Sequence, residues 1–109
     1  MDATKSCIFC EIIQKRIPAT FVHETDSLIV IKDINPSAPI HFLIIPKKHV
    51  VDISSMSEQD LALGRDIYAC AQELSRTYGD FKLIVNNGYK AGQRVFHLHA
   101  HFLGGLNEE

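Results

Sequence analysis

The chain has 109 residues, of which 46% are apolar, and a formal net charge of -2 with a sequence pI near 6.3. This length fits one domain spanning residues 1–109, and the composition is that of a folded protein. The weak negative charge and the lack of a basic run argue against nucleic acid as a partner. No apolar run approaches the roughly 20 residues of a membrane span, and the first residues lack a signal peptide's apolar region, so we expect a cytoplasmic protein.

The first half of the chain predicts one short helix and then three strands. Apolar residues at helical spacing predict a helix over Cys7–Arg16, which Pro18 ends. The following apolar segments are rich in β-branched residues and are separated by turn residues, which is typical of strands. Strands are predicted over residues 20–24, 28–32 and 41–45.

The second half predicts one long helix and two further strands. Ser57 suits the helix N-cap, Glu58 and Asp60 suit the positive end of the helix dipole, and Gly79 suits the end of the helix. Strands are predicted over residues 81–85 and 95–103. Because strands are grouped rather than alternating with helices, we expect an α+β fold with a five-stranded antiparallel sheet, one long helix and one short helix.

The last predicted strand contains the segment FHLHAHFLGG, in which His97, His99 and His101 alternate with apolar residues. Side chains at this spacing share one face of a strand, so the three imidazoles are expected to line one face. Such a row binds metal, supplies a nucleophile or donates hydrogen bonds to phosphate; a plain set of surface histidines is the simpler alternative. The preceding turn-rich loop, NNGYKAGQR, favours the phosphate interpretation because its backbone N–H groups can hold an anion.

The segment AGQRVFHLHAHFLGG resembles the signature of the histidine triad (HIT) family, in which three histidines alternate with apolar residues. CIFCEIIQKRIPA, KDINPSAPIHFLIIPKKH and NNG occur in the order expected for the Hint branch, whose members hydrolyse purine nucleoside phosphoramidates. The resemblance covers nearly the whole chain. It implies a nucleotide hydrolase or transferase that acts at the α-phosphate through a nucleotidyl-histidine intermediate.

By this resemblance His99 is the nucleophile, and His101 hydrogen-bonds the phosphate or the leaving group. His97 lies beside them in the catalytic row, and His41 approaches the row from a neighbouring strand. A neutral imidazole attacks phosphorus well, and the phosphoramidate that it forms is labile to water.

The resemblance also implies a nucleotide-binding site. Asp33 would accept hydrogen bonds from the ribose hydroxyls, although by sequence alone it is a turn residue. The purine slot would be apolar, and by composition its members are ordinary core residues: Phe9, Ile12, Ile31 and Ile34. Positions near the phosphate are Asn86, Gly92, Gln93, Arg94 and Val95. Arg94 stands where the family usually has Ser or Thr, so it either replaces the hydroxyl contact with charge or points to solvent.

Cys7 and Cys10 form a CxxC pair whose thiolates can share one metal. Some relatives carry this pair, and the resemblance implies a structural zinc site completed by His49 and His97, with no metal needed for the chemistry. The alternatives are a redox pair or two buried thiols. A redox pair usually follows a strand in a thioredoxin-like layout, which this sequence lacks.

Three functions are compatible with the sequence. The first is a purine nucleoside phosphoramidase acting on AMP- or GMP-type substrates; the second is a dinucleoside polyphosphate hydrolase; the third is a nucleotide-binding scaffold with incidental hydrolysis. The resemblance also implies a homodimer in which the long helix and the 81–85 strand form the interface, so that the two sheets become continuous.

Overall fold

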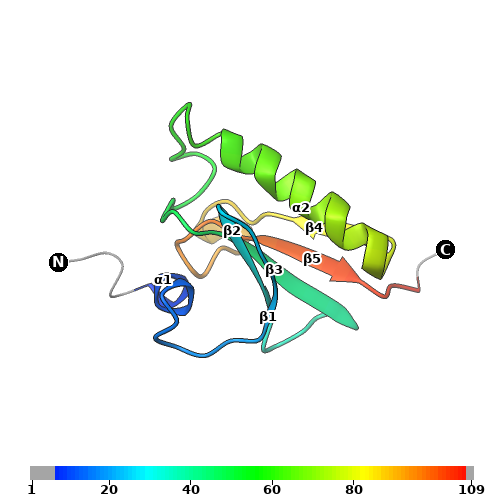
Figure 1. Ribbon diagram of the computed structural model, residues 1–109. Coiled ribbons are helices and arrows are strands. Elements are labelled where there is room, and N and C mark those ends of the chain that lie inside the picture. Colours follow the sequence, from blue (N-terminus) through cyan, green and yellow to red (C-terminus); the bar gives the residue numbers. More distant parts are fainter. Residues whose placement is uncertain (1–6, 108–109) are drawn as a thin grey trace.

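The computed structural model describes residues 7–107, and its centre is one five-stranded sheet in which every neighbouring pair is antiparallel (Figure 1). The spatial order is β1-β2-β3-β5-β4, so β3 is central and β1 and β4 are the edges. The strands are β1 (Phe21–Glu24), β2 (Leu28–Lys32), β3 (Ile40–Pro46), β4 (Phe81–Ile84) and β5 (Ala100–Gly104). The predicted α+β fold class is confirmed.

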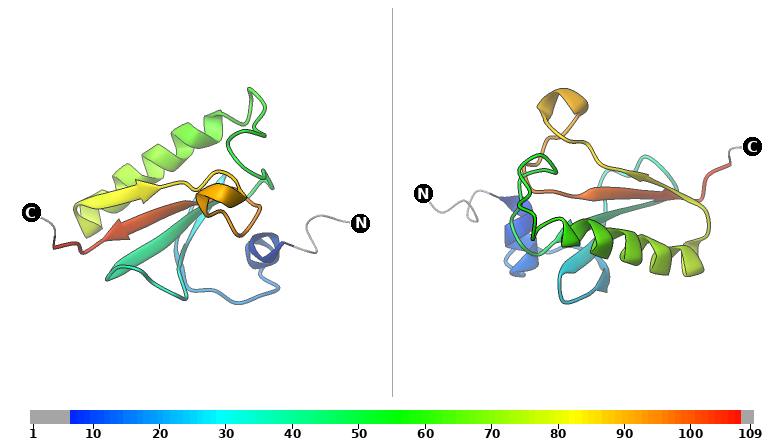
Figure 2. Two further views of the ribbon diagram at one scale, coloured as in Figure 1. Left: turned by 180° about the vertical axis from the view of Figure 1, so that it is seen from behind. Right: turned by 90° about the horizontal axis from the view of Figure 1, so that it is seen from above.

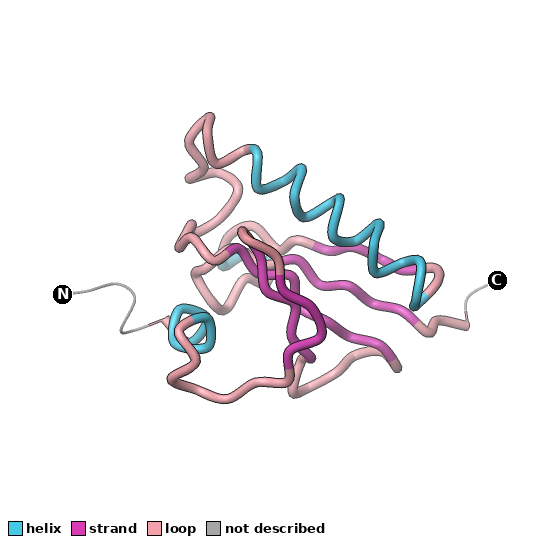
Figure 3. Tube along the Cα trace, in the orientation of Figure 1, coloured by secondary structure: helices cyan, strands magenta, loops and turns pink. Residues whose placement is uncertain are grey.

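In the part of the chain that the structure describes, two α-helices and one short 3-10 turn accompany the sheet. The short helix α1 is Ile8–Ile13, the long helix α2 is Ala62–Tyr78, and the turn η2 is Tyr89–Ala91. Figure 3 shows α2 running along the sheet and α1 near one end of it. Within residues 7–107, no helix has both the length and the apolar character needed to cross a bilayer.

The long helix begins later than the sequence predicts. Ser57 does act as a cap, because its Oγ accepts the Asp60 N–H at 3.1 Å while Asp60 Oδ2 accepts the Ser57 N–H at 3.2 Å. This reciprocal cap closes a separate turn ahead of Ala62, where α2 starts. The predicted end is confirmed, because Gly79 follows the helix with a φ of 81° that suits glycine.

The prediction of a strand over residues 95–103 is wrong at its beginning, since β5 starts at Ala100. Its partner β3 ends at Pro46, which has no N–H to extend the ladder. The segment before β5 instead follows the chain beyond β3, where the Leu98 N–H donates to the Val50 carbonyl at 2.6 Å. His97 and His99 therefore lie on an irregular segment, and only His101 is in the strand.

Alternation along the strands separates two layers of buried side chains. On β3, Phe42 and Ile44 pack toward α2, whereas Leu43 and Ile45 pack toward α1. Figure 2 shows the two helices on different sides of the sheet. The α2 face has the larger apolar layer: Leu28, Val30, Phe42, Ile44, Val50, Ile67, Cys70, Ala71, Leu74, Leu98, Ala100 and Phe102. The α1 face combines a smaller apolar layer with the imidazoles and two thiols described next.

Candidate active site and metal-binding cluster

The first part of the site is a hydrogen-bonded histidine pair on neighbouring strands. His41 of β3 and His101 of β5 face each other, with 2.9 Å between His41 Nε2 and His101 Nδ1. The Ser37 N–H donates to His41 Nδ1 at 3.0 Å, so the ring proton of His41 is on Nε2 and is donated to His101. In a neutral His101, the remaining proton is therefore on Nε2. Asp33 Oδ2 lies 3.4 Å from His41 Nε2 and favours the proton there.

The second part is His99, two residues ahead of His101. Its Nδ1 lies 2.8 Å from the main-chain oxygen of His97. A carbonyl oxygen only accepts, so Nδ1 carries the proton and Nε2 has a free electron pair in the neutral ring. The His99 ring meets the ring of His101 at 5.2 Å and the ring of Phe9 at 5.0 Å, both edge to face. A nucleophilic nitrogen and a proton donor thus lie on adjacent imidazoles.

Burial keeps these two imidazoles uncharged. It lowers the pKa of His99 from the ordinary 6.5, although the His97 carbonyl and Asp33 act in the opposite direction. Burial also lowers the pKa of His101, with further lowering from the neighbouring His99 and His41. At neutral pH both rings are therefore in the form that the hydrogen-bond pattern assigns, which is the form a nucleophile needs.

The third part is a cluster of two thiols and two imidazoles at the start of α1. Sγ of Cys7, Sγ of Cys10 and one ring nitrogen each of His49 and His97 all lie within 4.8 Å of one another. His97 Nδ1 is 3.4 Å from Cys7 Sγ and 3.5 Å from Cys10 Sγ, and His49 Nδ1 is 3.1 Å from Cys10 Sγ. The Cys7 sulfur caps α1 by accepting the Cys10 N–H at 3.4 Å.

The donor chemistry of this cluster fits a tetrahedral metal ion. His97 Nε2 donates to the Pro46 carbonyl at 2.7 Å, which leaves the electron pair of Nδ1 directed at the sulfurs. Complete burial lowers the pKa of His97 to about 4, so the ring is neutral, as a metal ligand must be. With Zn–S near 2.3 Å and Zn–N near 2.05 Å, sulfur and nitrogen ligands stand about 3.5 Å apart. The three sulfur–nitrogen distances given above, 3.1 to 3.5 Å, are near this spacing, so the cluster could hold a metal ion.

The structure places the predicted nucleotide residues in two groups. Phe9, Ile12 and Ile31 are buried together between α1 and the sheet, next to the His99 ring. Ile34 is 90% exposed and lies outside that apolar layer. Three of the four residues predicted for the purine slot therefore share one buried layer, and Ile34 does not belong to it, because it follows the end of β2 and is exposed.

The loop ahead of the histidines is braced by its own side chains. Gln93 is buried; its amide donates to the carbonyls of Val51 and Val95, and its oxygen accepts the Gly88 N–H. Asn86 Nδ2 donates to the Ala91 carbonyl at 2.8 Å. These two residues, predicted near the phosphate, fix the loop conformation through side-chain hydrogen bonds.

Arg94 is an exposed residue of this loop, and its side chain contacts Tyr89. Its guanidinium lies 4.3 Å from the centre of the Tyr89 ring, and Nη1 donates to the Tyr89 carbonyl at 2.8 Å. The side chain is therefore folded back on η2. Gly92, next to it in the loop, has a φ of 99°, and a Cβ there would meet Asn86 Nδ2 at 3.3 Å.

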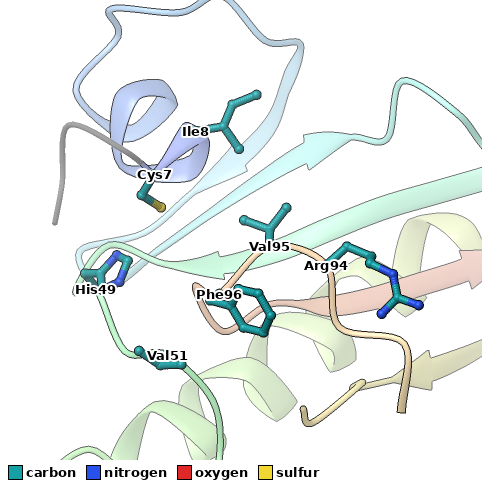
Figure 4. Close-up of a pocket in the computed structure, with 7 residues that line it drawn as sticks. All are labelled: Cys7, Ile8, His49, Val51, Arg94, Val95 and Phe96. Atoms are coloured by element: carbon teal, nitrogen blue, oxygen red, sulfur yellow. The ribbon is translucent and has the colours of Figure 1, made fainter. Parts of the chain in front are cut away.

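A surface hollow of about 440 Å³ opens beside the metal-binding cluster (Figure 4). Cys7 and His49 reach it from one side, and the Arg94–Phe96 segment forms the other side. Its further lining is apolar and comes from Ile8 and Val51. Val51 and Phe96, which line this hollow, were not predicted as site residues, because each is an ordinary apolar residue next to another one, Val50 and Val95, in an irregular segment.

Three comparisons with known proteins agree on the origin of this arrangement. Residues 6–108 match the family model described as the scavenger mRNA decapping enzyme C-terminal binding family. An uncharacterised HIT-like protein of Synechocystis is 45% identical over 101 residues, which cover 90% of this chain and 89% of the relative. Among solved structures, a HIT family hydrolase of Clostridium thermocellum superposes with a TM-score of 0.91 at 40% identity, covering 96% of this chain and 95% of that one.

A zinc-bound histidine triad protein of Mycobacterium smegmatis superposes with a TM-score of 0.83 at 30% identity, covering 98% of this chain and 80% of that one. Fold and site together define a small α+β protein with three neighbouring imidazoles and a fold shared with a HIT family hydrolase. The chain belongs to the histidine triad family, and its cysteine–histidine cluster is of the CxxC zinc-binding type.

Proposed function

We propose that the protein is a purine nucleoside 5′-phosphoramidase that works through a nucleotidyl-His99 intermediate. The observation that supports it most is the proton arrangement: His99 has a free Nε2 electron pair, and His101 carries its proton on Nε2 beside it. The related HIT family hydrolase of C. thermocellum supports a hydrolytic reaction.

In this reaction His99 Nε2 attacks the α-phosphorus, and the phosphorus–nitrogen bond of the substrate breaks. The leaving amine takes the Nε2 proton of His101. The hydrogen-bonded His41–His101 pair is then left with one proton fewer and a negative charge, which offsets the positive charge that attack creates on the His99 ring. Water then attacks the nucleotidyl-imidazole and gives its proton back to His101. The nucleoside monophosphate leaves, and His99 regains its free electron pair.

The substrate would bind across the α1 face. The purine occupies the apolar layer that includes Phe9, Ile12 and Ile31, and the ribose hydroxyls donate to the Asp33 carboxylate. Asp33 lies 3.4 Å from His41, which places the ribose site beside the histidine pair.

The cluster of Cys7, Cys10, His49 and His97 would hold zinc. Its donor set, the neutral His97 ring and the zinc-bound relative of M. smegmatis support this assignment. When bound, zinc supplies structural cross-linking of α1 to the residues after β3 and before β5. The chain's own contribution is to present two sulfurs and two imidazole nitrogens at tetrahedral spacing.

The functional unit would be a homodimer joined through α2 and β4. The support is that β4 is an edge strand and that apolar side chains of this region are exposed, including Tyr68 at 72% and Ile84 at 39%. Sedimentation of the protein at twice the monomer mass is the expected result, and a monomer would remove the dimer from the account. A cytoplasmic location remains a prediction from the sequence.

The test of the reaction is a side-by-side assay of adenosine 5′-phosphoramidate and a diadenosine polyphosphate. We expect the phosphoramidate to be the better substrate, and the His99→Ala variant to lose its hydrolysis. If the diadenosine polyphosphate is the better substrate, the protein is instead a dinucleoside polyphosphate hydrolase. Binding of AMP without turnover of either substrate would assign the scaffold function.

A further inference from the structure

His97 is a member of the metal-binding cluster and also forms a hydrogen bond with His99, the proposed nucleophile. Its ring Nδ1 lies 3.4 and 3.5 Å from the sulfurs of Cys7 and Cys10, and its main-chain oxygen accepts the His99 Nδ1–H at 2.8 Å. We propose that His97 is a positioning residue, and that metal occupancy of the cluster sets the orientation of the His99 nucleophile through the His97 peptide. This proposal rests on the proposed role of His99.

The hydrogen bond between His97 and His99 matters because both residues lie outside the regular sheet. His97 and His99 precede β5, so the ladder that fixes His101 does not reach them. The His97 ring is completely buried and is held on its other side by the Pro46 carbonyl at 2.7 Å. The peptide that carries the His97 main-chain oxygen is thus held from two directions: its Leu98 N–H donates to the carbonyl of Val50, the residue next to His49, and the His97 ring is held at the cluster. The proposed nucleophile is hydrogen-bonded directly to that peptide.

A second contact connects the same two places. Phe9 stands between Cys7 and Cys10 on the first turn of α1, and its ring meets the His97 ring at 5.9 Å and the His99 ring at 5.0 Å, both edge to face. When the two sulfurs bind an ion, the first turn of α1 is held in place. The Phe9 ring, which the His99 ring contacts, is held with it. The hydrogen bond to the His97 carbonyl and the contact with the Phe9 ring both act on the orientation of the His99 ring.

The expected size of the effect follows from the geometry of in-line attack. An error of about 1 Å in a reacting group costs about 100-fold in rate, and loss of a residue that orients a metal ligand typically costs about 10- to 100-fold. In the proposed site, substrate binding uses Asp33, Ile12 and Ile31 in addition to Phe9. Only Phe9 of these four packs its ring on both His97 and His99, so affinity should change less than rate. A rate effect without a matching affinity effect is what distinguishes positioning from general loss of structure.

His49 is the ligand best suited to a test, because it reaches the cluster from the segment after β3 and lies outside the predicted catalytic row. His49→Ala removes one of four ligands. His49→Cys restores a four-ligand set of the Cys₃His type that zinc accepts. Cys70→Ser is the matched control, since Cys70 is a buried thiol in α2 outside the cluster.

Four quantities are measured on full-length protein: metal content by mass spectrometry, thermal unfolding, AMP affinity, and the single-turnover rate of nucleotidyl transfer from adenosine 5′-phosphoramidate. A fifth, the ¹⁵N spectrum of the His99 ring at one fixed pH, reports which ring nitrogen carries the proton. We expect folded His49→Ala to lose the metal and about 10- to 100-fold in single-turnover rate, with AMP affinity within about threefold. Its ¹⁵N spectrum should change from the Nδ1–H form to a mixture of both tautomers.

His49→Cys should regain the metal, the rate and the Nδ1–H spectrum, and Cys70→Ser should match the wild type in all three. A folded, metal-free His49→Ala with the wild-type rate and an unchanged His99 spectrum would overturn the proposal. So would a metal-bound His49→Cys that behaves like His49→Ala. If the wild type itself transfers no nucleotide, the proposed function fails, and the ¹⁵N spectra still decide whether the cluster orients His99.

Discussion

The two faces of the sheet are built from the same strands but have different chemistry. Toward α2 the strands direct side chains such as Phe42 and Phe102 into a closed apolar layer, where the Phe102 ring stacks on the Phe42 and Phe81 rings at 5.9 and 4.5 Å. Toward α1 the same strands direct His41 and His101 beside an apolar layer that is smaller and contains two thiols. One face supplies stability, and the other holds a polar network at the cost of apolar burial.

The difference between the two faces shows how a chain of 109 residues can combine a stable core with a polar site. A small domain buries a limited fraction of its surface, so each buried polar group must be offset by apolar packing elsewhere. Here the α2 layer provides that packing, and β3 and β5 carry both functions on alternating residues. Substitutions on the two faces should therefore change different measured quantities, and the four predictions below test that separation.

The largest effect is expected at His101. His101→Ala removes the proton donor beside the nucleophile, and a general acid typically contributes about 10²- to 10⁴-fold. We expect kcat for an adenosine phosphoramidate to fall within that range, while thermal unfolding stays close to the wild type. His23→Ala, at an exposed position of β1, is the control and should leave kcat unchanged. A His101→Ala variant with the wild-type kcat would exclude His101 from the chemistry.

The next effect is on stability, on the opposite face. Phe102 has no exposed surface and stacks on two rings, so Phe102→Ala should lower the free energy of unfolding by about 3–5 kcal/mol. Urea denaturation, followed by circular dichroism, measures this change in the free energy of unfolding. The fraction that remains folded should still accept a nucleotide on His99. A loss of transfer that exceeds the loss of folded protein would show that the two faces are not separate.

The pH dependence should report burial on the α1 face. Transfer requires His99 neutral, and its folded pKa lies below 6.5 because burial disfavours the charged form. The neutral form therefore persists as the pH falls through 6.5, and protonation inactivates the site only at lower pH. We expect the acid limb of the single-turnover rate to be centred below pH 6.5, with a decline of about tenfold per pH unit. An acid limb centred above pH 6.5 would contradict the buried, neutral imidazole.

The smallest effect comes from a matched pair of methylene deletions. Ile44→Val acts on the α2 face and Ile31→Val on the α1 face, and both side chains are buried. Each should lower the free energy of unfolding by about 0.5–1.5 kcal/mol. We expect only Ile31→Val to raise the dissociation constant of AMP, as measured by calorimetry. Equal AMP affinities for the two variants would place the purine away from the α1 layer.

The sequence predicted the fold class and the approximate positions of the five strands, because alternation and turn residues are visible in the chain. The grouping of the cysteines with His49 and His97 was implied by the family resemblance, and the structure brings these four residues together. It did not predict that β5 begins at Ala100, because Pro46 ends the partner strand and this consequence appears only when the strands pair. Ile34 reads as an apolar slot residue, yet its exposure depends on the path of the loop after β2.

The protonation pattern of the histidines was also beyond the sequence. It depends on main-chain groups from other segments: the Ser37 N–H, the His97 carbonyl and the Pro46 carbonyl. The residue type of a backbone partner does not predict its hydrogen bonds, so the ring nitrogen that carries the proton in His41, His99 and His101 could be assigned only from the structure. The roles of His99 and His101 themselves were implied by the family resemblance. Arg94 is a similar case, since its contact with the Tyr89 ring and carbonyl depends on the conformation of η2.

The most direct test of the account is intact-mass spectrometry of the protein, quenched shortly after mixing with adenosine 5′-phosphoramidate. The account predicts a mass gain of one adenylyl group in the wild type, no gain in His99→Ala, and a gain that persists longer in His101→Ala than in the wild type. No mass gain in a wild type that hydrolyses the substrate, or an adenylyl group that still forms in His99→Ala, would contradict it.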